Sequence, residues 1–405
     1  MTQTLTTDRD YKKRKQDAMP PADLEDTSVA KAIKPEVKCY TDDAKDQGFG
    51  FFAANSFFRA HYTSGGEAFD KQATLPLTPI EIGYRLWSSY KLMDAEENEH
   101  YQSGGTSAST TLYDGKGYLI TVTLADTSAF AVVYEQSGAV LGLARLNQRI
   151  HTPTDAIEKE RLLSTGVTIE EGQISLGDLR LNVSRSIGDH FTSDPAGRAI
   201  ISAEASIDIT HLNIILKTLK IELGQVGKIQ LIATCAGFAN GVVAKEQQTK
   251  KSHEDYLLEK LAAISLPGNL SEVTLAEQLT RAAIADCSRK NVSIAIQTLT
   301  HNSPTLMGMY DGHGNTDVAQ HVAHHIPHVF VEQCRLSHTS YKEQAMSIYN
   351  NQHAYQRDNA EPYTSAFRLV GNIAHAKSSL FTLNRYADMA LSISTHGYSK
   401  VSLPL

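Results

Sequence analysis

The sequence has few cysteines, and their spacing fits neither a thiolate metal site nor a disulfide framework. The four cysteines Cys39, Cys235, Cys287 and Cys334 stand singly, with no Cys-x-x-Cys pair. A small disulfide-stapled fold and a structural zinc site of the thiolate type are therefore not indicated. A reducing compartment such as the cytoplasm suits this cysteine content best.

Long apolar runs and a strong charge of one sign are also missing. No segment approaches the roughly 18 consecutive apolar residues that a membrane-spanning helix needs, and residues 1–10 lack the pattern of a signal peptide. The 38 Lys and Arg face 45 Asp and Glu, which gives a formal net charge of −7. We therefore expect a soluble cytoplasmic protein with no general affinity for nucleic acid or for a membrane.

Apolar runs typical of strands alternate with stretches of helical periodicity. The predicted strands are residues 49–54, 118–123, 129–134, 139–144, 229–234 and 292–299. The predicted helices are residues 80–98, 156–165, 211–222, 253–264, 275–287 and 317–334. We expect hairpins around Asp126 and around Gln136-Ser137-Gly138. Antiparallel strand blocks separated by helix pairs predict an α+β sandwich and not a doubly wound parallel sheet.

An Asp-Gly turn stands between an apolar strand and a helix in the last third of the chain. Residues 305–310 run into Asp311-Gly312-His313-Gly314, and the helical pattern starts at about Asp317. A carboxylate and a backbone carbonyl at a sheet edge suit a hard cation such as Mg²⁺ or Mn²⁺. Taken alone, an Asp-Gly sequence in this position is more often ordinary turn chemistry.

Several separate blocks resemble the metal-dependent PPM-type, or type 2C, Ser/Thr protein phosphatases over roughly residues 85–330. Residues 307–326 are similar to the family's DGHG strand, turn and helix, and residues 181–189 resemble its SRxxGD block. The other matching blocks are residues 104–108, 118–133, 146–168, 229–243 and 275–296. The resemblance implies a sandwich of two antiparallel β-sheets flanked by helix pairs.

The resemblance also implies an activity and a site. In the family, two Mg²⁺ or Mn²⁺ ions activate a bridging water that attacks phosphoserine or phosphothreonine in a phosphoprotein substrate. Asp311 matches the bridging catalytic and metal-ligating acid, with the carbonyl of Gly312, and Asp126 matches an acid linked to an additional metal. Arg185 is a candidate phosphate ligand, although a structural role for the Ser184, Arg185 and Asp189 block is the favoured alternative.

Other ligand positions of the family are altered. Ala236 and Asn240 stand where two acids are expected, and Lys290 replaces a third. Alanine offers no oxygen, and an ammonium repels a dication at contact distance by several kcal/mol in a partly dry site, so we expect fewer ions than in the family. Two functions remain: a metal-dependent phosphatase, or a pseudophosphatase that binds a protein partner. A single-metal site acting on another phosphoester lies between them.

The order of the blocks is unusual. The DGHG block follows the last strand, whereas the family places it near the N-terminus, and residues 49–56 occupy that early position without its carboxylate. Either the chain is circularly rearranged, or a degenerate domain is followed by part of a second copy. In the first case, which the short connector 300–304 favours, residues 292–299 and 305–310 form a hairpin.

The predicted organisation has three parts. Residues 1–48 are polar and form a lead-in segment, and residues 49–335 form the phosphatase-like domain with the DGHG block at 305–334. Residues 336–405 are a C-terminal extension, either an appended element or the completion of the sandwich. Within 317–334, the i,i+4 pair His321 and His325 has a spacing that lets two imidazoles share an ion, but a solvent-facing helix is the default.

Overall fold

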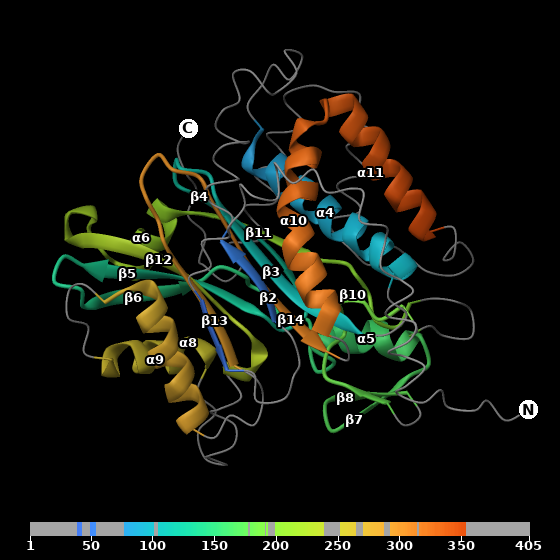
Figure 1. Ribbon diagram of the computed structural model, residues 1–405, viewed down its shortest axis with the longest axis horizontal. Helices are drawn as coiled ribbons and strands as arrows, with labels where there is room; N and C mark the ends of the chain where they lie inside the picture. Colours follow the sequence, from blue (N-terminus) through green and yellow to red (C-terminus); the bar gives the residue numbers. More distant parts are fainter. Residues whose placement is uncertain are drawn as a thin grey trace, which may run out of the picture. The chain divides into compact units, whose positions relative to one another are not determined.

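The computed structural model describes residues 39–42, 49–53, 77–100, 104–176, 179–190, 192, 199–238, 252–264, 270–286, 292–313 and 316–353. These residues form two antiparallel sheets that pack face to face, with helices on both outer faces (Figure 1). The α+β sandwich expected from the sequence is therefore confirmed. None of the helices in these ranges is long and apolar enough to cross a membrane.

The first sheet has five strands in the order β1-β13-β12-β5-β6. Their bounds are Cys39–Asp42 for β1, Val292–Thr298 for β13, Val226–Thr234 for β12, Ser128–Glu135 for β5 and Val140–Arg145 for β6. Helices α8 (His253–Ala263) and α9 (Glu272–Ala285) cover its outer face. Each of the two helices starts at a serine N-cap, Ser252 or Ser271, whose hydroxyl accepts a hydrogen bond from a backbone N–H of the first turn.

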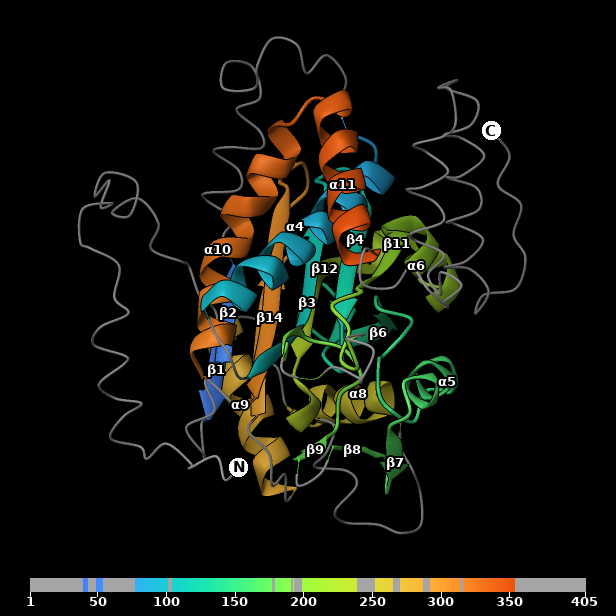
Figure 2. The same ribbon diagram turned by 90° about the vertical axis from the view of Figure 1, so that its right-hand side faces the viewer.

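The second sheet has six strands and carries the candidate site. Its main path is β11-β4-β3-β14-β2, and β10 pairs with β3 off this path. The bounds are Ser206–His211 for β11, Tyr118–Leu124 for β4, Gly105–Tyr113 for β3, Thr305–His313 for β14, Phe49–Ala53 for β2 and Ile187–Gly188 for β10. Helices α4 (Pro79–His100) and α10 (Thr316–Arg335) pack on its outer face, and α11 (His338–His353) lies against α4 (Figure 2).

The layer between the sheets is partly apolar and partly a row of hydroxyl groups. Apolar side chains such as Leu231, Met307 and Met309 fill one part of it. Elsewhere the small polar residues of β3 face those of β4, and Thr111 hydrogen-bonds Thr121 at 3.1 Å. Because each hydroxyl can donate and accept, these buried groups satisfy one another.

A smaller unit adjoins the sandwich. A three-stranded sheet, with β7 (Thr168–Glu170), β8 (Gln173–Leu176) and β9 (Leu179–Leu181), packs with α5 (Ala156–Ser164) around its own apolar cluster. The helix α6 (Leu212–Leu219) follows β11 directly, and a short 3-10 turn at Leu223–Gln225 leads into β12.

Two predicted hairpins are wrong for the same reason. The strands on either side of Asp126, β4 and β5, belong to different sheets, and so do β13 and β14 on either side of residues 300–304. Each turn therefore passes from one sheet to the other, because flanking strands that are buried on both faces can pair with distant neighbours instead. The third predicted hairpin, β5 with β6, is confirmed.

The position of β14 bears on the order of the blocks. Although it comes last among the strands, β14 lies inside the six-stranded sheet and pairs with both β3 and β2. It is thus part of the same sandwich, which supports a rearranged order over a fragment of a second copy. Strand β1 falls within residues 1–48, the predicted lead-in segment, and α11 falls within the predicted extension 336–405, where it adds to the helical layer.

Candidate functional site

Asp311 lies near the end of β14, on the face that meets the other sheet. The register places Asp311 opposite Ser107 of β3. Side chains alternate along a strand, and Met307 and Met309 of the same strand belong to the inter-sheet core. Asp311 follows them on this face, half-buried, where the apolar layer gives way to polar groups.

Asp126 and Gly312 join Asp311 at this place. Asp126 lies in the turn between β4 and β5, and its Oδ1 accepts a hydrogen bond of 3.1 Å from the hydroxyl of Ser107. Ser107 is the residue opposite Asp311 in the ladder, so Asp126 contacts the strand residue beside Asp311. Gly312 is the next residue of β14 and is buried opposite Thr106. The three predicted metal-ligating residues are thus brought together.

Two side chains from the segment after β6 hold the turn that carries Asp126. Ala125 has the left-handed φ of 70°, which is unfavourable for a residue with a Cβ. The buried His151 fixes it, because its backbone N–H donates to the Ala125 carbonyl at 2.8 Å and its Nδ1 accepts from the Ala125 N–H at 3.2 Å. Asn147 holds the other end through Thr127 and Ala129.

His151 is held as a neutral imidazole. Its pKa is lowered well below the ordinary value, first by burial and then by the charge of Arg185. Since Nδ1 accepts a hydrogen bond, the ring proton is on Nε2, which lies 2.7 Å from the hydroxyl of Ser206.

His313 and Asp189 form a second polar pair beside the carboxylates. Asp189 is buried, and its Oδ2 accepts hydrogen bonds of 2.6 Å from His313 Nε2 and of 2.6 Å from the Ser186 hydroxyl. Burial, the largest single effect, lowers the pKa of His313, but Asp189 followed by Asp311 and Asp126 outweighs it, so the pKa is raised. The raised pKa favours the protonated form of His313, whose charge opposes that of the carboxylates.

The carboxylate of Asp189 leaves no room for a side chain at Gly105. A side chain on Gly105 would place its Cβ 2.5 Å from Asp189 Oδ2, so glycine is required there. On the other side, Asp94 of α4 accepts a hydrogen bond of 2.9 Å from the Gly188 N–H and lies 3.3 Å from His190 Nε2. Burial raises the pKa of Asp94. The segment 188–190 is therefore fixed between α4 and β3.

The end of β12 brings the thiol of Cys235 close to Asp311. Cys235 is buried, and its Sγ accepts a hydrogen bond of 3.1 Å from the Ser293 N–H. Burial and then the charge of Asp311 raise the pKa of the Cys235 thiol to about 12, so it stays neutral. Ala236 follows, the residue that the resemblance in sequence pairs with a family ligand acid. Asn240 and Lys290 lie outside the described residues.

This set of donors does not fit a pair of divalent ions. Hard cations prefer several carboxylate and carbonyl oxygens, and two ions side by side need enough anions to offset their repulsion. Asp126 and Asp311 are two such groups, whereas Cys235 is a neutral thiol and the side chain of Ala236 has no donor atom. Within the parts of the chain that the structure describes, no group of three His, Cys, Asp or Glu side chains is arranged to hold a metal ion.

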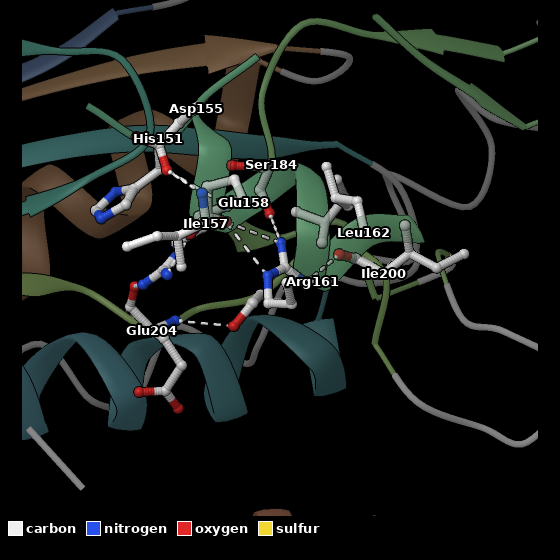
Figure 3. A network of polar contacts seen from close by, with 12 residues as sticks. His151, Asp155, Ile157, Glu158, Arg161, Leu162, Ser184, Ile200 and Glu204 are labelled. Carbon is white, nitrogen blue, oxygen red and sulfur yellow. Dashed lines mark hydrogen bonds and ion pairs between the residues drawn. The ribbon is translucent and has the colours of Figure 1, made fainter. Parts of the chain in front are cut away.

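Arg185 lies in a buried ion-pair network and does not face the carboxylates as a phosphate ligand would. It pairs with Glu158 of α5 and donates to the carbonyl of Glu204. Glu158 is fully buried, and Arg161 of the same helix contacts it at 3.1 Å (Figure 3). Although burial raises the pKa of Glu158, the hydrogen bond and charge of Arg185 lower it to about 2. These contacts support the structural alternative for Arg185.

Arg161 extends the network to the backbone. It donates to the Ile200 carbonyl at 2.9 Å and to the Ser184 carbonyl at 2.7 Å, which ties α5 to two loops (Figure 3). Sequence reasoning found the block that contains Arg161 but not this role. It also missed His151, Asn147 and Asp94, because no local pattern marks a side chain whose partners are distant in the chain.

Comparison with known proteins agrees with this arrangement over part of the chain. Residues 77–214 match the family model described as Protein phosphatase 2C. The matched segment includes Asp126 and Asp189 and ends before β12 and β14. No curated protein matches the chain.

Likeness to solved structures is distant. A sex-determining protein of C. elegans is 17% identical with a TM-score of 0.43, over 66% of this chain and 65% of that one. A phosphatase from a pathogenic strain of Toxoplasma gondii is 13% identical with a TM-score of 0.38, over 68% of this chain and 92% of that one. A serine-threonine phosphatase 2C from Toxoplasma gondii is 15% identical with a TM-score of 0.36, over 68% and 90%.

The chain therefore spans less than two thirds of the C. elegans protein, and at these identities and scores the likeness says nothing about activity. The family match is what confirms the resemblance expected from the sequence. Over residues 77–214 the chain is thus similar to the protein phosphatase 2C family.

Proposed function

We propose that this chain is a pseudophosphatase, in which a type 2C domain serves as a protein-binding or regulatory module. One observation carries the proposal. At the end of β12, where the family has a ligand acid, the chain has Ala236 beside the neutral thiol of Cys235. A methyl group and a thiol cannot balance the charge of two dications, and Lys290 adds a positive charge at another family acid.

The retained Asp-Gly-His sequence has a structural explanation that needs no metal. Gly312 and His313 are ladder residues of β14, opposite Thr106 and Gly105 of β3. His313 also contacts the buried Asp189, whose carboxylate would otherwise keep only the hydroxyl of Ser186 as a side-chain partner. Loss of His313 would therefore weaken the fold whether or not the site is catalytic.

The proposed ligand of the module is a protein. Phosphatases of this family act on phosphoproteins. A domain that keeps the sandwich but loses the metal centre can keep the surface that binds such a protein. We propose that the domain binds a phosphoprotein or an unmodified protein, and not nucleic acid or a membrane.

A metal-dependent phosphatase is the competing function, and a specific observation supports it. Asp126 contacts Ser107, which lies opposite Asp311 in the ladder, so both carboxylates lie at this end of β3. The competing function requires that these two carboxylates and the Gly312 carbonyl hold a single Mg²⁺ or Mn²⁺. Such an ion would polarise a phosphoryl oxygen when bound.

Hydrolysis of p-nitrophenyl phosphate with Mn²⁺ tests the proposal. We expect no turnover above that of the Asp311→Ala variant, with an active type 2C phosphatase as the positive control. Calorimetric titration with Mn²⁺ is expected to show at most one bound ion. Robust turnover that Asp311→Ala abolishes, together with two bound ions, would overturn the pseudophosphatase proposal.

Restoring the missing acid gives an independent check. Ala236→Asp supplies a carboxylate at the family position, and Ala236→Asn is the matched control of similar size without the charge. We expect Ala236→Asp to bind Mn²⁺ at least about tenfold more tightly than the natural chain, and Ala236→Asn to leave binding unchanged. Equal Mn²⁺ affinity in all three would contradict the idea that the acid at position 236 is what the site lacks.

A further inference from the structure

A pocket opens on the side of the sandwich where an edge strand of one sheet lies near an edge strand of the other. Strand β6 is the last strand of the first sheet, β11 is the first strand of the second, and α6 contacts both (Figure 2). The candidate site lies elsewhere, at the ends of β12 and β14. The apolar wall of the pocket consists of Ala144, Leu146, Ile209, Ile214 and Ile215.

The carboxylate of Asp208 lines this pocket. Side chains alternate along β11, and Ile207 and Ile209 pack toward the helices outside the second sheet, so Asp208 faces the first sheet. It is half-buried, and its Oδ2 accepts a hydrogen bond of 3.1 Å from the backbone N–H of Gln148. Among the residues that the structure describes, no cationic side chain is paired with Asp208, and its Oδ1 accepts no hydrogen bond.

Arg145 also lines the pocket, but its charge is directed at another acid. Its guanidinium pairs with Glu254 of α8 and lies over the ring of Phe130, 5.0 Å from the centroid. Phe130 belongs to the core beneath α8 and α9, so the guanidinium lies on the outer face of the first sheet. Burial raises the pKa of Asp208 to about 7, although the hydrogen bond from Gln148 lowers it. An ionised Asp208 therefore lacks a compensating charge.

The size and chemistry of the pocket select a small cationic group on an apolar stem. Its volume is about 30 Å³, which admits one or two water-sized groups and not a drug-sized molecule. One oxygen of Asp208 is already bound to Gln148, so a single oxygen remains. A guanidinium prefers both oxygens of a carboxylate, whereas an ammonium is a compact donor that one oxygen can bind. Methylene groups can pack against the apolar wall.

We propose that this pocket binds a lysine side chain of a protein partner, with the ammonium at Asp208 and the methylenes against Leu146 and Ile214. The place of the pocket suits such a ligand, because a partner segment that lies along the edge strand β6 or β11 can reach it with one side chain. The origin of the lysine rests on the protein-binding function proposed above. The pocket itself is formed without Asp126 or Asp311.

NMR titration of the full chain with n-butylammonium, which is a lysine side chain without its backbone, tests the proposal. We expect saturable shifts of the methyl signals of Ile209, Ile214 and Ile215. Asp208→Asn keeps the shape and removes the charge, so it should weaken binding at least about tenfold, and n-butanol should bind the natural chain equally weakly. Glu160→Gln is the matched control, because it removes a carboxylate from an exposed position of α5, and it should leave the affinity unchanged.

The pH dependence gives a second measurement that needs no variant. Asp208 is ionised above its pKa of about 7 and n-butylammonium stays protonated, so the affinity should rise about tenfold from about pH 6 to about pH 8. The other charged groups on this side are Arg145 and its partner Glu254, whose pKa is lowered, so Glu254 stays ionised over this range. From α6 the pocket is lined by Ile214, Ile215 and Thr218, which do not titrate.

Three outcomes would overturn the proposal: no saturable shift at the three isoleucines, equal affinity in the natural chain and Asp208→Asn, or tighter binding of n-butylguanidinium than of n-butylammonium. If Asp208→Asn unfolds, an affinity of the natural chain that does not change with pH refutes the role of Asp208. Robust Mn²⁺-dependent turnover with intact amine binding would overturn the pseudophosphatase proposal and leave the pocket, so the two proposals fail separately.

Discussion

At the scale of single residues, the turn at Asp126 depends on a histidine from the far side of β6. Ala125 adopts φ of 70°, a conformation that costs about 1–2 kcal/mol for a residue with a Cβ. His151 offsets this by binding both polar groups of the Ala125 backbone. It acts on the carboxylate of Asp126 through the backbone, so it is a positioning residue.

Replacing this histidine should be costly for the fold. His151→Ala leaves the buried N–H of Ala125 without its acceptor and leaves a cavity, and we expect it to lower the free energy of unfolding in urea by about 3–5 kcal/mol. His301→Ala is the control, since His301 is exposed, and it should change the free energy by less than about 0.5 kcal/mol. Equal effects of the two substitutions would contradict the proposed role of His151.

The same histidine predicts a pH dependence. The pKa of His151 is lowered in the folded protein, so the unfolded chain binds more protons below the ordinary value of about 6.5. The stability that neutral His151 contributes is therefore present above this pH and is lost as the pH falls. The difference in unfolding free energy between the natural chain and His151→Ala should decrease by up to about 1.4 kcal/mol per pH unit below pH 6.5. If this difference in unfolding free energy stays constant down to pH 5, the pH dependence is not due to His151.

At the scale of elements, one arginine ties three helices together. Arg85 of α4 is buried, and its guanidinium donates to the carbonyls of Gln333 and Leu336 at the end of α10. It also lies over the ring of Tyr341 in α11, 4.4 Å from the centroid. A cation is favourable at a helix C-terminus because the last carbonyls lack partners within the helix.

Arg85→Met should remove the contacts that join α4 to the end of α10 and to α11. The side chain keeps much of its volume but loses its donors, so we expect a loss of about 2–4 kcal/mol in unfolding free energy. Hydrogen exchange should quicken at the end of α10 and in α11 before other helices. Arg281→Met on α9, where the exposed arginine pairs with Glu277 of its own helix, should change the stability by less than about 0.5 kcal/mol. Unaltered hydrogen exchange in α10 would contradict the proposed role of Arg85 at the end of this helix.

The elements themselves were largely predictable from the sequence. Helices such as α4 and α10 follow the spacing of their apolar residues, and strands such as β5 and β12 are continuous apolar runs. Strand β3 was missed because its small polar residues are typical of a turn. They are buried only because β4 supplies matching hydroxyls, as in Thr111 and Thr121.

The site was predictable only in part. The resemblance indicated Asp311, Gly312 and Asp126, and the structure brings these three residues together. The sequence alone could not show whether another side chain near Asp311 replaces the acid that is missing at Ala236. The positions of His151 and Asp94 follow from tertiary contacts that no local pattern encodes.

At the scale of the whole molecule, strands from distant parts of the chain complete each sheet. In the second sheet β14 lies between β3 and β2, and in the first sheet β13 lies between β12 and β1. Without β14, the core between the second sheet and its helices would lose α10 as well. The fold therefore depends on the last third of the sequence.

A chain that ends at residue 299 should consequently fail to fold cooperatively. We expect it to bind hydrophobic dyes and to show no sharp urea transition. Co-expression with a fragment of residues 300–405 should restore the transition, because β14 needs only its two neighbours to dock. A cooperative transition in residues 1–299 alone would show that β14 is dispensable.

The central place of β14 also has a consequence for synthesis on the ribosome. Strands β3 and β4 emerge early, yet the inner edge of β3 has to wait until residue 305 has left the exit tunnel. An unpaired edge exposed for so long can join the wrong strand or another nascent chain. Translation speed and chaperone supply should thus influence the yield of folded protein more than they do for a domain whose paired strands are consecutive in the sequence.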